Sequence, residues 1–227
     1  MPGWTNGLPL ALTVEDRYSG RMPAETHVPT REEALALFRA HNASESLMQH
    51  ALAVEGVMRS IARRTGEDEE KWGIVGLVHD IDYERHPEEH CRVSPEILRG
   101  AGWPEEYIHA VASHGWGICS DVEPRERMEK VLYAVDELTG LVKAAALMRP
   151  SRSVLDMEAS SVQKKWKDAR FAAGVNRSVI EKGAVMLGVE LSQLITDTIL
   201  GMREVAREIG LGGTPPAAAG SPPGGAP

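Results

Sequence analysis

The adjacent residues His79 and Asp80 carry side chains that could bind a divalent metal ion. They follow an apolar stretch, Trp72 to Val78, which has the composition of a buried helix. The imidazole offers one nitrogen and the carboxylate offers two oxygens, so the carboxylate could bridge two ions. A single His-Asp pair is weak evidence for a metal site, because such pairs occur by chance in many proteins of this size.

Further metal-binding side chains flank this pair in the sequence, each in or beside an expected helix: His50, His90, His114 and Asp136. Ligands from different elements can surround an ion, whereas one short segment cannot. His50 supports a site independently, because it falls on an apolar stripe with Val54 and Val57, where an unpartnered imidazole would be costly to bury. The candidate ligands are imidazoles and carboxylates, without a thiolate. Such a set favours Fe or Mn, with Co, Ni and Zn as alternatives, and disfavours a structural zinc site.

Two further histidines and both cysteines carry weaker signals. Pro87 makes His86 a residue that precedes a helix, and His109 falls on a different helix face from the other candidates. Both histidines are therefore interpreted as solvated surface residues. Cys91 and Cys119 are interpreted as small apolar fillers or exposed thiols rather than ligands, and two thiols agree with a reducing cytosol.

Composition limits the class of protein. The chain has 227 residues, enough for one domain with a full core, and its formal net charge of −8 argues against general nucleic-acid binding. A run of about 18 apolar residues and a leader pattern are both absent, so we expect a soluble, cytoplasmic protein without membrane association. Aromatic residues make up 5% of the chain and strand-like alternation is nearly absent, which favours an all-α fold.

Periodicity and turn residues divide the chain into segments. Residues 1–29 contain several Gly and Pro without sustained periodicity, so we expect an irregular N-terminal arm. The expected helices span residues 30–41, 44–66, 68–80, 87–99, 104–113, 124–147, 177–187 and 190–209. Residues 212–227 contain only Gly, Pro, Ala, Ser and Thr, cannot bury a core and are expected to be disordered.

The order of the six candidate ligands resembles the HD superfamily of metal-dependent phosphohydrolases in its two-metal version. This resemblance implies that His50, His79, Asp80 and Asp136 hold the first metal, while His90 and His114 serve the second, with Asp80 as the bridge. The stretch from His90 to His114 is similar to the corresponding part of bacterial HD hydrolases that cleave dinucleoside polyphosphates. Residues 30–210 together resemble small bacterial HD-domain proteins.

The same resemblance implies a fold and a reaction. The fold would be an all-α, HD-type bundle, with residues 30–150 as the metal-binding catalytic core and residues 151–211 as a small helical extension with a basic segment. The reaction would be hydrolysis of a phosphoester or phosphoanhydride in a small, nucleotide-like substrate, by a monomer or a homodimer. A water shared by two divalent ions is acidified toward a pKa of about 7, so hydroxide is available at neutral pH. Asp80 is then the catalytic bridge, and Asp82 is a second catalytic candidate that orients the water or a ligand imidazole.

The chain departs from the common HD pattern directly after the His-Asp pair. Many HD proteins continue with Ile-Gly-Lys, whose lysine lies near the substrate phosphate, whereas this chain has Ile-Asp-Tyr at positions 81 to 83. The candidates to replace that cation are Arg85, Arg92, Lys143, Lys164, Lys165, Lys167 and Arg170. The lysines from position 164 onward could instead form a solvated basic face. If they bind phosphate, neutralising Lys164, Lys165 and Lys167 together should raise the Michaelis constant.

Two other classes of protein share this ligand set. Diiron oxygenases, resembling myo-inositol oxygenase and phosphonate-cleaving enzymes, hold a chelating substrate and dioxygen at the open metal positions. A non-catalytic HD module would bind a nucleotide or a partner in the same pocket. An oxygenase would be silent on phosphoesters and would consume oxygen in its iron form, whereas a binding module would combine tight nucleotide binding with little turnover.

Overall fold

The structure is a computed structural model that describes residues 27–213, and every regular element within that range is helical. The all-α prediction is therefore confirmed. Residues 27–29 of the expected N-terminal arm have no regular structure. The rest of that arm, and the expected tail beyond residue 213, lie outside the described residues.

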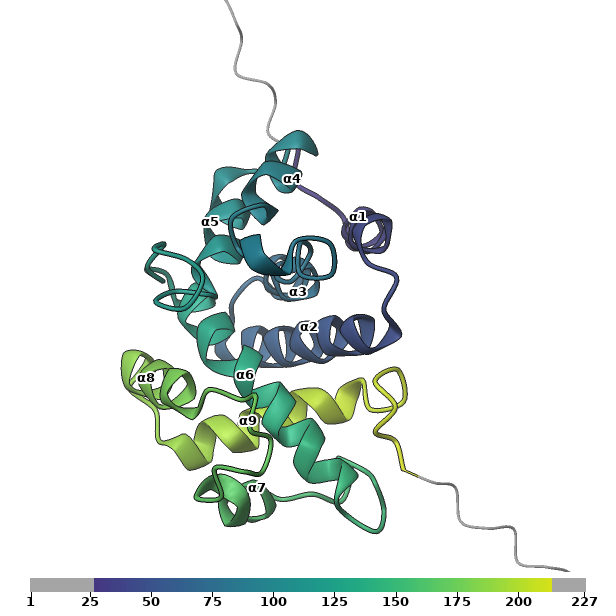
Figure 1. The fold of residues 1–227 in the computed structure, drawn as a ribbon, viewed down its shortest axis with the longest axis vertical. Coiled ribbons are helices and arrows are strands. Elements are labelled where there is room, and N and C mark those ends of the chain that lie inside the picture. The colour runs from purple at the N-terminus through teal and green to yellow at the C-terminus, as the bar shows by residue number, and fades with distance from the viewer. Residues whose placement is uncertain (1–26, 214–227) are drawn as a thin grey trace, which may run out of the picture.

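The helices form two groups on either side of a central helix, α2 (Figure 1). The first group and α2 come from the N-terminal half: α1 Arg31–His41, α2 Glu45–Thr65, α3 Glu69–Val78, α4 Ser94–Gly100 and α5 Glu105–Ser113. α6, Arg127–Leu147, leads from this group into the second. The second group contains α7 Ala159–Trp166, α8 Arg177–Leu187 and α9 Leu191–Glu204.

Local sequence signals explain where the first helices begin and end. Thr30 and Glu33 form a capping box, in which each side chain accepts the backbone N–H of the other residue. Ser44 caps the start of α2, and Gly66 ends it with a left-handed φ of 75°. Asp68 caps α3 in the same way. After this short turn α3 crosses α2, and the two helices pack against each other through buried apolar residues (Figure 1).

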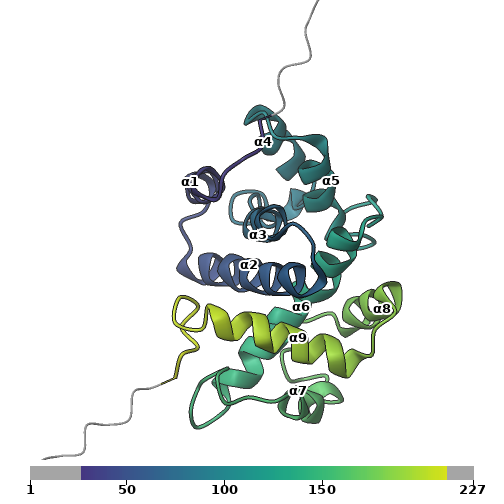
Figure 2. The same cartoon turned by 180° about the vertical axis from the view of Figure 1, so that it is seen from behind.

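One continuous apolar core joins the two groups. α2 packs against α3 on one side and against α6 and α9 on the other, as the reverse view also shows (Figure 2). Val54, Val57 and Ile61, the stripe expected to face the core, are buried. The core extends from Ala34 to Leu211, so the C-terminal extension shares it with the N-terminal helices.

The crossing of α2 and α9 depends on glycine. A Cβ at Gly201 would lie 2.5 Å from Val57 Cα, closer than packed carbon atoms approach, and 3.1 Å from Gly56 O, which is also a tight contact. Replacing Gly201 by alanine should therefore destabilise the protein by about 1–3 kcal/mol, the usual effect of overpacking a core. Urea unfolding measures this change.

Gly140 provides the matched control, because it lies inside α6 and a Cβ there would make an ordinary contact, 3.6 Å from Val175 Cγ2. Gly140→Ala should stabilise the protein by about 0.5–1 kcal/mol through reduced backbone freedom in the unfolded chain. A Gly201→Ala protein as stable as the Gly140→Ala protein would show that the two helices do not cross so closely.

The observed elements differ from the expected ones in four main places. The helix expected over residues 87–99 is split into a short 3-10 turn, Pro87–Glu89, and α4, and between them Cys91 has a left-handed φ of 65°, which lies outside the helical range. The helix expected from residue 124 begins at Arg127, where Glu126 forms the capping box. α9 ends at Glu204, five residues before the expected end, and α7 was not among the expected helices.

The length and apolar content of the described helices bear on membrane spanning. No single helix between residues 27 and 213 is long and apolar enough to cross one. α8 and α9 have the necessary length and composition only when taken together, across a bend of 101°.

Candidate metal centre

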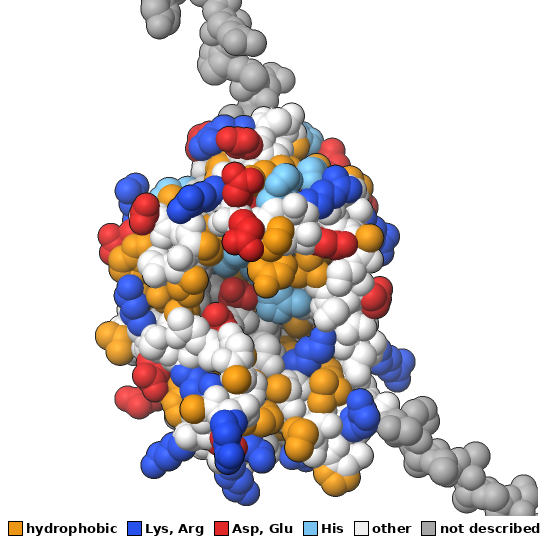
Figure 3. Space-filling model, viewed as in Figure 1, with side chains coloured by type: hydrophobic (Ala, Val, Ile, Leu, Met, Phe, Trp, Pro, Cys, Tyr) orange, Lys and Arg blue, Asp and Glu red, His pale blue; other side chains and the backbone are white. Residues whose placement is uncertain are grey.

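The six predicted ligands meet at the floor of a cleft between the two helix groups. His50 comes from α2 and Asp136 from α6, whereas the other four lie just outside helices: His79 and Asp80 after α3, His90 before α4 and His114 after α5. The cleft has a volume of about 750 Å³. Figure 3 shows histidine and acidic side chains in a hollow across the middle of this face. The structure thus brings together all six residues that the sequence singled out.

The first group of donors combines His50, His79 and Asp136. Asp136 Oδ1 lies 2.9 Å from His50 Nε2 and 3.4 Å from His79 Nε2. The two imidazoles approach each other through their Nε2 atoms, which are 3.2 Å apart. The three side chains therefore direct one donor atom each toward a common point.

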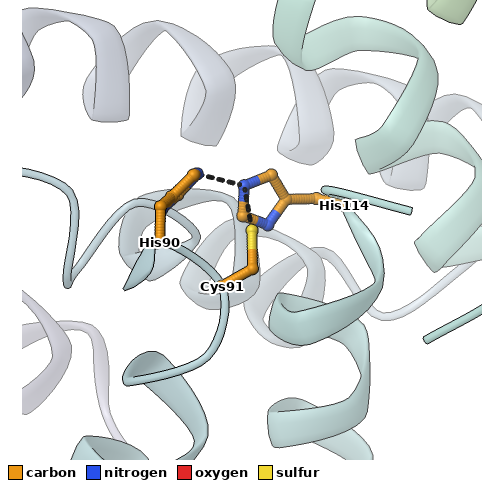
Figure 4. A group of neighbouring side chains, drawn as sticks. All are labelled: His90, Cys91 and His114. Carbon is orange, nitrogen blue, oxygen red and sulfur yellow. Dashed lines mark hydrogen bonds between the residues drawn. The ribbon is translucent and has the colours of Figure 1, made fainter. Parts of the chain in front are cut away.

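The second group of donors combines His90 and His114, whose Nε2 atoms are also 3.2 Å apart (Figure 4). Asp80 connects the two groups. Its Oδ2 lies 3.6 Å from His50 Nε2 and 3.4 Å from His79 Nε2. Its Oδ1 lies 3.4 Å from His90 Nε2 and 3.5 Å from His114 Nε2. One carboxylate oxygen thus faces each histidine pair.

Hydrogen bonds fix the tautomer that three of the four imidazoles adopt when they are neutral. Each donates its Nδ1–H to an oxygen that can only accept: His79 to Gly76 O at 2.8 Å, His114 to Val111 O at 2.6 Å and His90 to Asp82 Oδ1 at 2.8 Å. In a neutral imidazole the other nitrogen, Nε2, then carries a lone pair.

This pattern tests whether a metal fits the site. The Nε2 atoms of His90 and His114 face each other at 3.2 Å, and in two neutral rings held through Nδ1 their lone pairs repel unless a metal ion or a proton lies between them. Neutral imidazoles held through Nδ1 are the usual state of histidine ligands. The donor set of the cluster therefore fits divalent ions, and two groups have the necessary spacing: His50, His79 and Asp80, and His90, Cys91 and His114.

The carboxylates stay ionised despite their burial. Burial alone would raise the pKa of Asp80 and of Asp136, but the facing imidazoles reverse the effect and hold both pKa values well below the usual range. Burial likewise lowers the pKa of His79, but the two carboxylates outweigh it and raise that pKa. The cluster thus concentrates negative charge that attracts a cation.

Asp82 supports the second group from behind. Its side chain is fully buried, and its Oδ1 accepts the Nδ1–H of His90 while its Oδ2 accepts the backbone N–H of Ser94 at 2.8 Å. Both oxygens are therefore engaged, and Asp82 does not line the cleft. Of the two roles expected for Asp82, this geometry suits the orientation of an imidazole rather than of a water.

The expected phosphate-binding cations do not come together with this cluster. Within residues 27–213 the lining of the cleft contains no lysine or arginine. Two of the candidates bond elsewhere: Arg85 Nη2 donates to Ala40 O at 2.6 Å, and Lys143 Nζ donates to Gln49 Oε1 at 3.3 Å. Lys164 and Lys165 lie in the last turn of α7, and Lys167 follows that helix.

The surroundings of the cluster contain two contacts that the sequence did not predict. His109, expected to be solvated, is half-buried because its Nδ1 lies 2.7 Å from Oε1 of the buried Glu129. Cys91, interpreted as a filler or an exposed thiol, is buried with its Sγ 3.6 Å from His114 Nε2 (Figure 4). The adjacency of Cys91 to His90 in the sequence was the available signal for this contact.

Comparisons with known proteins place the chain in one domain family. The profile of the HD domain family matches residues 47–160, half of the chain. Ribonuclease Y of Oleidesulfovibrio alaskensis is 29% identical over 100 residues, covering 43% of this chain and 18% of that protein. Ribonuclease Y of Nitratidesulfovibrio vulgaris strain DP4 is 29% identical over 101 residues, with the same coverage. The chain therefore spans less than a fifth of the length of these relatives, and no solved structure gave a significant match. The family match shows that this chain belongs to the HD domain family, whose members are generally metal-dependent hydrolases.

Proposed function

We propose that this protein is a metal-dependent phosphohydrolase that cleaves a phosphoester or phosphoanhydride bond in a small, nucleotide-like substrate. The observation that carries the proposal is the position of Asp80, whose two oxygens face two separate histidine pairs. Two ions that share one carboxylate can together bind the attacking and the leaving oxygens of a displacement at phosphorus. HD family membership supports the same reaction class.

The ligand assignment follows from the two groups of donors. His50, His79, Asp80 and Asp136 would hold the first ion, and Asp80, His90 and His114 the second. When bound, the ions would supply hydroxide at neutral pH and neutralise charge on the phosphoryl oxygens. Imidazole and carboxylate donors suit Fe or Mn, with Co, Ni and Zn as alternatives.

The walls of the cleft favour a small substrate over a nucleic-acid strand. A volume of about 750 Å³ lies in the range of small-molecule sites. A strand needs cations along its backbone, whereas this lining contains none within the described residues and the whole chain carries a formal net charge of −8. Apolar residues line the cleft beside the metal cluster and could accept a base: Leu47, Ile118, Val175 and Val179. The named ribonuclease relatives act, by name, on RNA, and the proposal shares with them only phosphate-ester cleavage.

Replacing Asp82 by asparagine tests the support of the second ion. An amide cannot accept both the Nδ1–H of His90 and the N–H of Ser94, because its nitrogen donates. The affinity for the second ion should therefore fall by about 10- to 100-fold, the usual effect of losing an outer-shell partner, while the first ion stays bound. Titration of the metal-free protein with Mn²⁺ measures both affinities.

Asp121→Asn makes the same chemical change at an exposed carboxylate outside the cluster, and both affinities should stay at their original values. Equal affinities in the Asp82→Asn and Asp121→Asn proteins would remove the positioning role of Asp82. Thermal unfolding of each variant without metal separates a loss of ligand orientation from a loss of fold.

The absence of lysine and arginine in the described lining also fits a second candidate function, a diiron oxygenase with a small chelating substrate. The two proposals predict different products. Phosphate release from a nucleotide panel, with Mn, Fe, Co, Ni or Zn supplied in turn, supports the hydrolase. Oxygen uptake by the iron-loaded protein, without phosphate release, supports the oxygenase.

A further inference from the structure

Cys91 and Cys119 form a pair of thiols beside the second group of histidines. Both are free cysteines, and their Sγ atoms lie 2.8 Å apart. This separation is less than an ångström longer than the S–S bond of a disulfide, which is about 2.05 Å. The residues are 28 positions apart in the sequence, so the fold and not the local chain brings them together.

Gly115 makes this close approach possible. A Cβ at position 115 would overlap Cys119 Sγ and would lie 2.5 Å from Cys91 Sγ, so a larger residue would separate the two sulfurs. The carbonyl of Gly115 also accepts the backbone N–H of Cys119 at 3.0 Å, which turns the chain back toward His114. The left-handed φ of 65° at Cys91 bends the facing segment. The local structure on both sides therefore holds the thiols together.

The two sulfurs differ in access. Cys119 is partly exposed and lines both the cleft of the metal cluster and a second hollow on the neighbouring surface. Cys91 also lines the second hollow but not the cleft, and it is only 3% exposed. A small reagent therefore reaches Cys119 first, and Cys91 lies behind it in position to attack the sulfur that has reacted.

We propose that Cys91 and Cys119 form a reversible disulfide by exchange with low-molecular-weight disulfides. The Cys119 thiolate attacks one sulfur of the reagent, forms a mixed disulfide and releases the first reagent thiol. The Cys91 thiolate then attacks Cys119 Sγ, breaks the mixed bond and releases the second reagent thiol. Two electrons and two protons pass from the cysteine pair to the reagent, and a reduced thiol reverses both steps.

Formation of the disulfide would change the chemical surroundings of His114 in the cleft. Cys91 Sγ lies 3.6 Å from His114 Nε2, so oxidation converts a thiol at that nitrogen into a disulfide sulfur that has no proton and no thiolate form. The sulfur chemistry itself does not depend on the reaction that the metal cluster supports. Counting thiols therefore tests the pair even if the proposed hydrolase activity is absent.

The test equilibrates the full chain with mixtures of reduced and oxidised glutathione, followed by alkylation, intact mass measurement and tryptic mapping. Both thiols should disappear together, with a mass loss of two hydrogen atoms and no glutathione adduct. Trypsin should then release residues 86–92 linked to residues 100–125. Added reductant should restore two free thiols per chain.

Two variants separate the steps. Cys91→Ser removes the second attacking thiol, so a stable adduct of glutathione with Cys119 should accumulate. Gly115→Ala should lower the disulfide fraction by separating the sulfurs, whereas Gly100→Ala, where a Cβ meets nothing within 4 Å, should leave it unchanged. Circular dichroism checks the fold of each variant, and Cys91→Ser remains decisive if Gly115→Ala does not fold.

Two results would overturn the inference. The first is a wild-type protein in which the Cys119–glutathione adduct accumulates as it does in Cys91→Ser, because Cys91 then does not attack. The second is a wild-type protein that keeps both free thiols at every ratio of oxidised to reduced glutathione.

Discussion

Replacing Asp80 by alanine is expected to abolish the binding of both metal ions and all turnover. Asp80 presents Oδ2 to His50 and His79 and Oδ1 to His90 and His114, so its loss removes a ligand from each ion at once. The effect should exceed the roughly 10- to 100-fold loss typical of an outer-shell partner. Metal content after dialysis and the rate of phosphate release measure the two consequences.

Asp121→Ala is the control for this change, because it removes an exposed carboxylate outside the cluster and should retain both ions. Circular dichroism of the metal-free Asp80→Ala protein shows whether the helices are preserved. A folded Asp80→Ala protein that keeps two ions and its activity is incompatible with a bridging carboxylate.

Replacing His90 by alanine is expected to remove one ion and keep the other. His90 contacts His114 and Asp80 Oδ1, whereas the first group of donors, His50, His79 and Asp136, does not use it. Metal content should fall from two ions per chain to one. The rate of phosphate release should fall by at least about 100-fold. In other enzymes, removing a single group that stabilises charge in the transition state lowers the rate by that factor.

His86→Ala provides the matched control, since His86 is a nearby histidine that does not line the cleft. The His86→Ala protein should keep two ions and full activity. If the His90→Ala protein also keeps full activity, the enzyme works with a single ion and the second group of donors has another role. The companion variant His50→Ala should affect the first ion instead.

The six candidate ligands could be singled out from the sequence because the prediction depends on residue type and on an order that resembles the HD family. His50 lies on the apolar stripe of α2, and its neighbours on that stripe show which face of the helix is buried. His79 and Asp80 follow the apolar helix α3 directly, so their position near the core was also a local property. Helix type and most helix ends followed from periodicity and capping residues for the same reason.

The break before α4 could not be read in the same way, because its cause is a tertiary contact. Asp82 accepts hydrogen bonds from the side chain of His90 and from the backbone N–H of Ser94, which lies 12 positions after Asp82. Because Asp82 holds both residues, the segment from His90 to Ser94 does not continue as a helix. The contact between Cys91 and Cys119 likewise depends on the turn at Gly115. Neither contact leaves a periodic signal in the sequence.

Charge patterns were the least informative part of the sequence. The lysines near position 164 form a local excess of positive charge. The charge pattern does not predict whether their side chains face the cleft or the solvent. In the structure Val162 is the buried residue of that helix, and its lysines are absent from the cleft lining. The substrate phosphate would therefore meet the proposed ions instead of a lysine.

The most direct test of the proposed function is metal stoichiometry on the full chain purified without chelator, followed at once by phosphate release from a nucleotide panel. We expect two divalent ions per chain and phosphate release that disappears when the ions are removed and returns when they are restored. Two irons per chain with oxygen uptake and no phosphate release would contradict the hydrolase, and a fully active protein with only one ion would contradict the bridging role of Asp80.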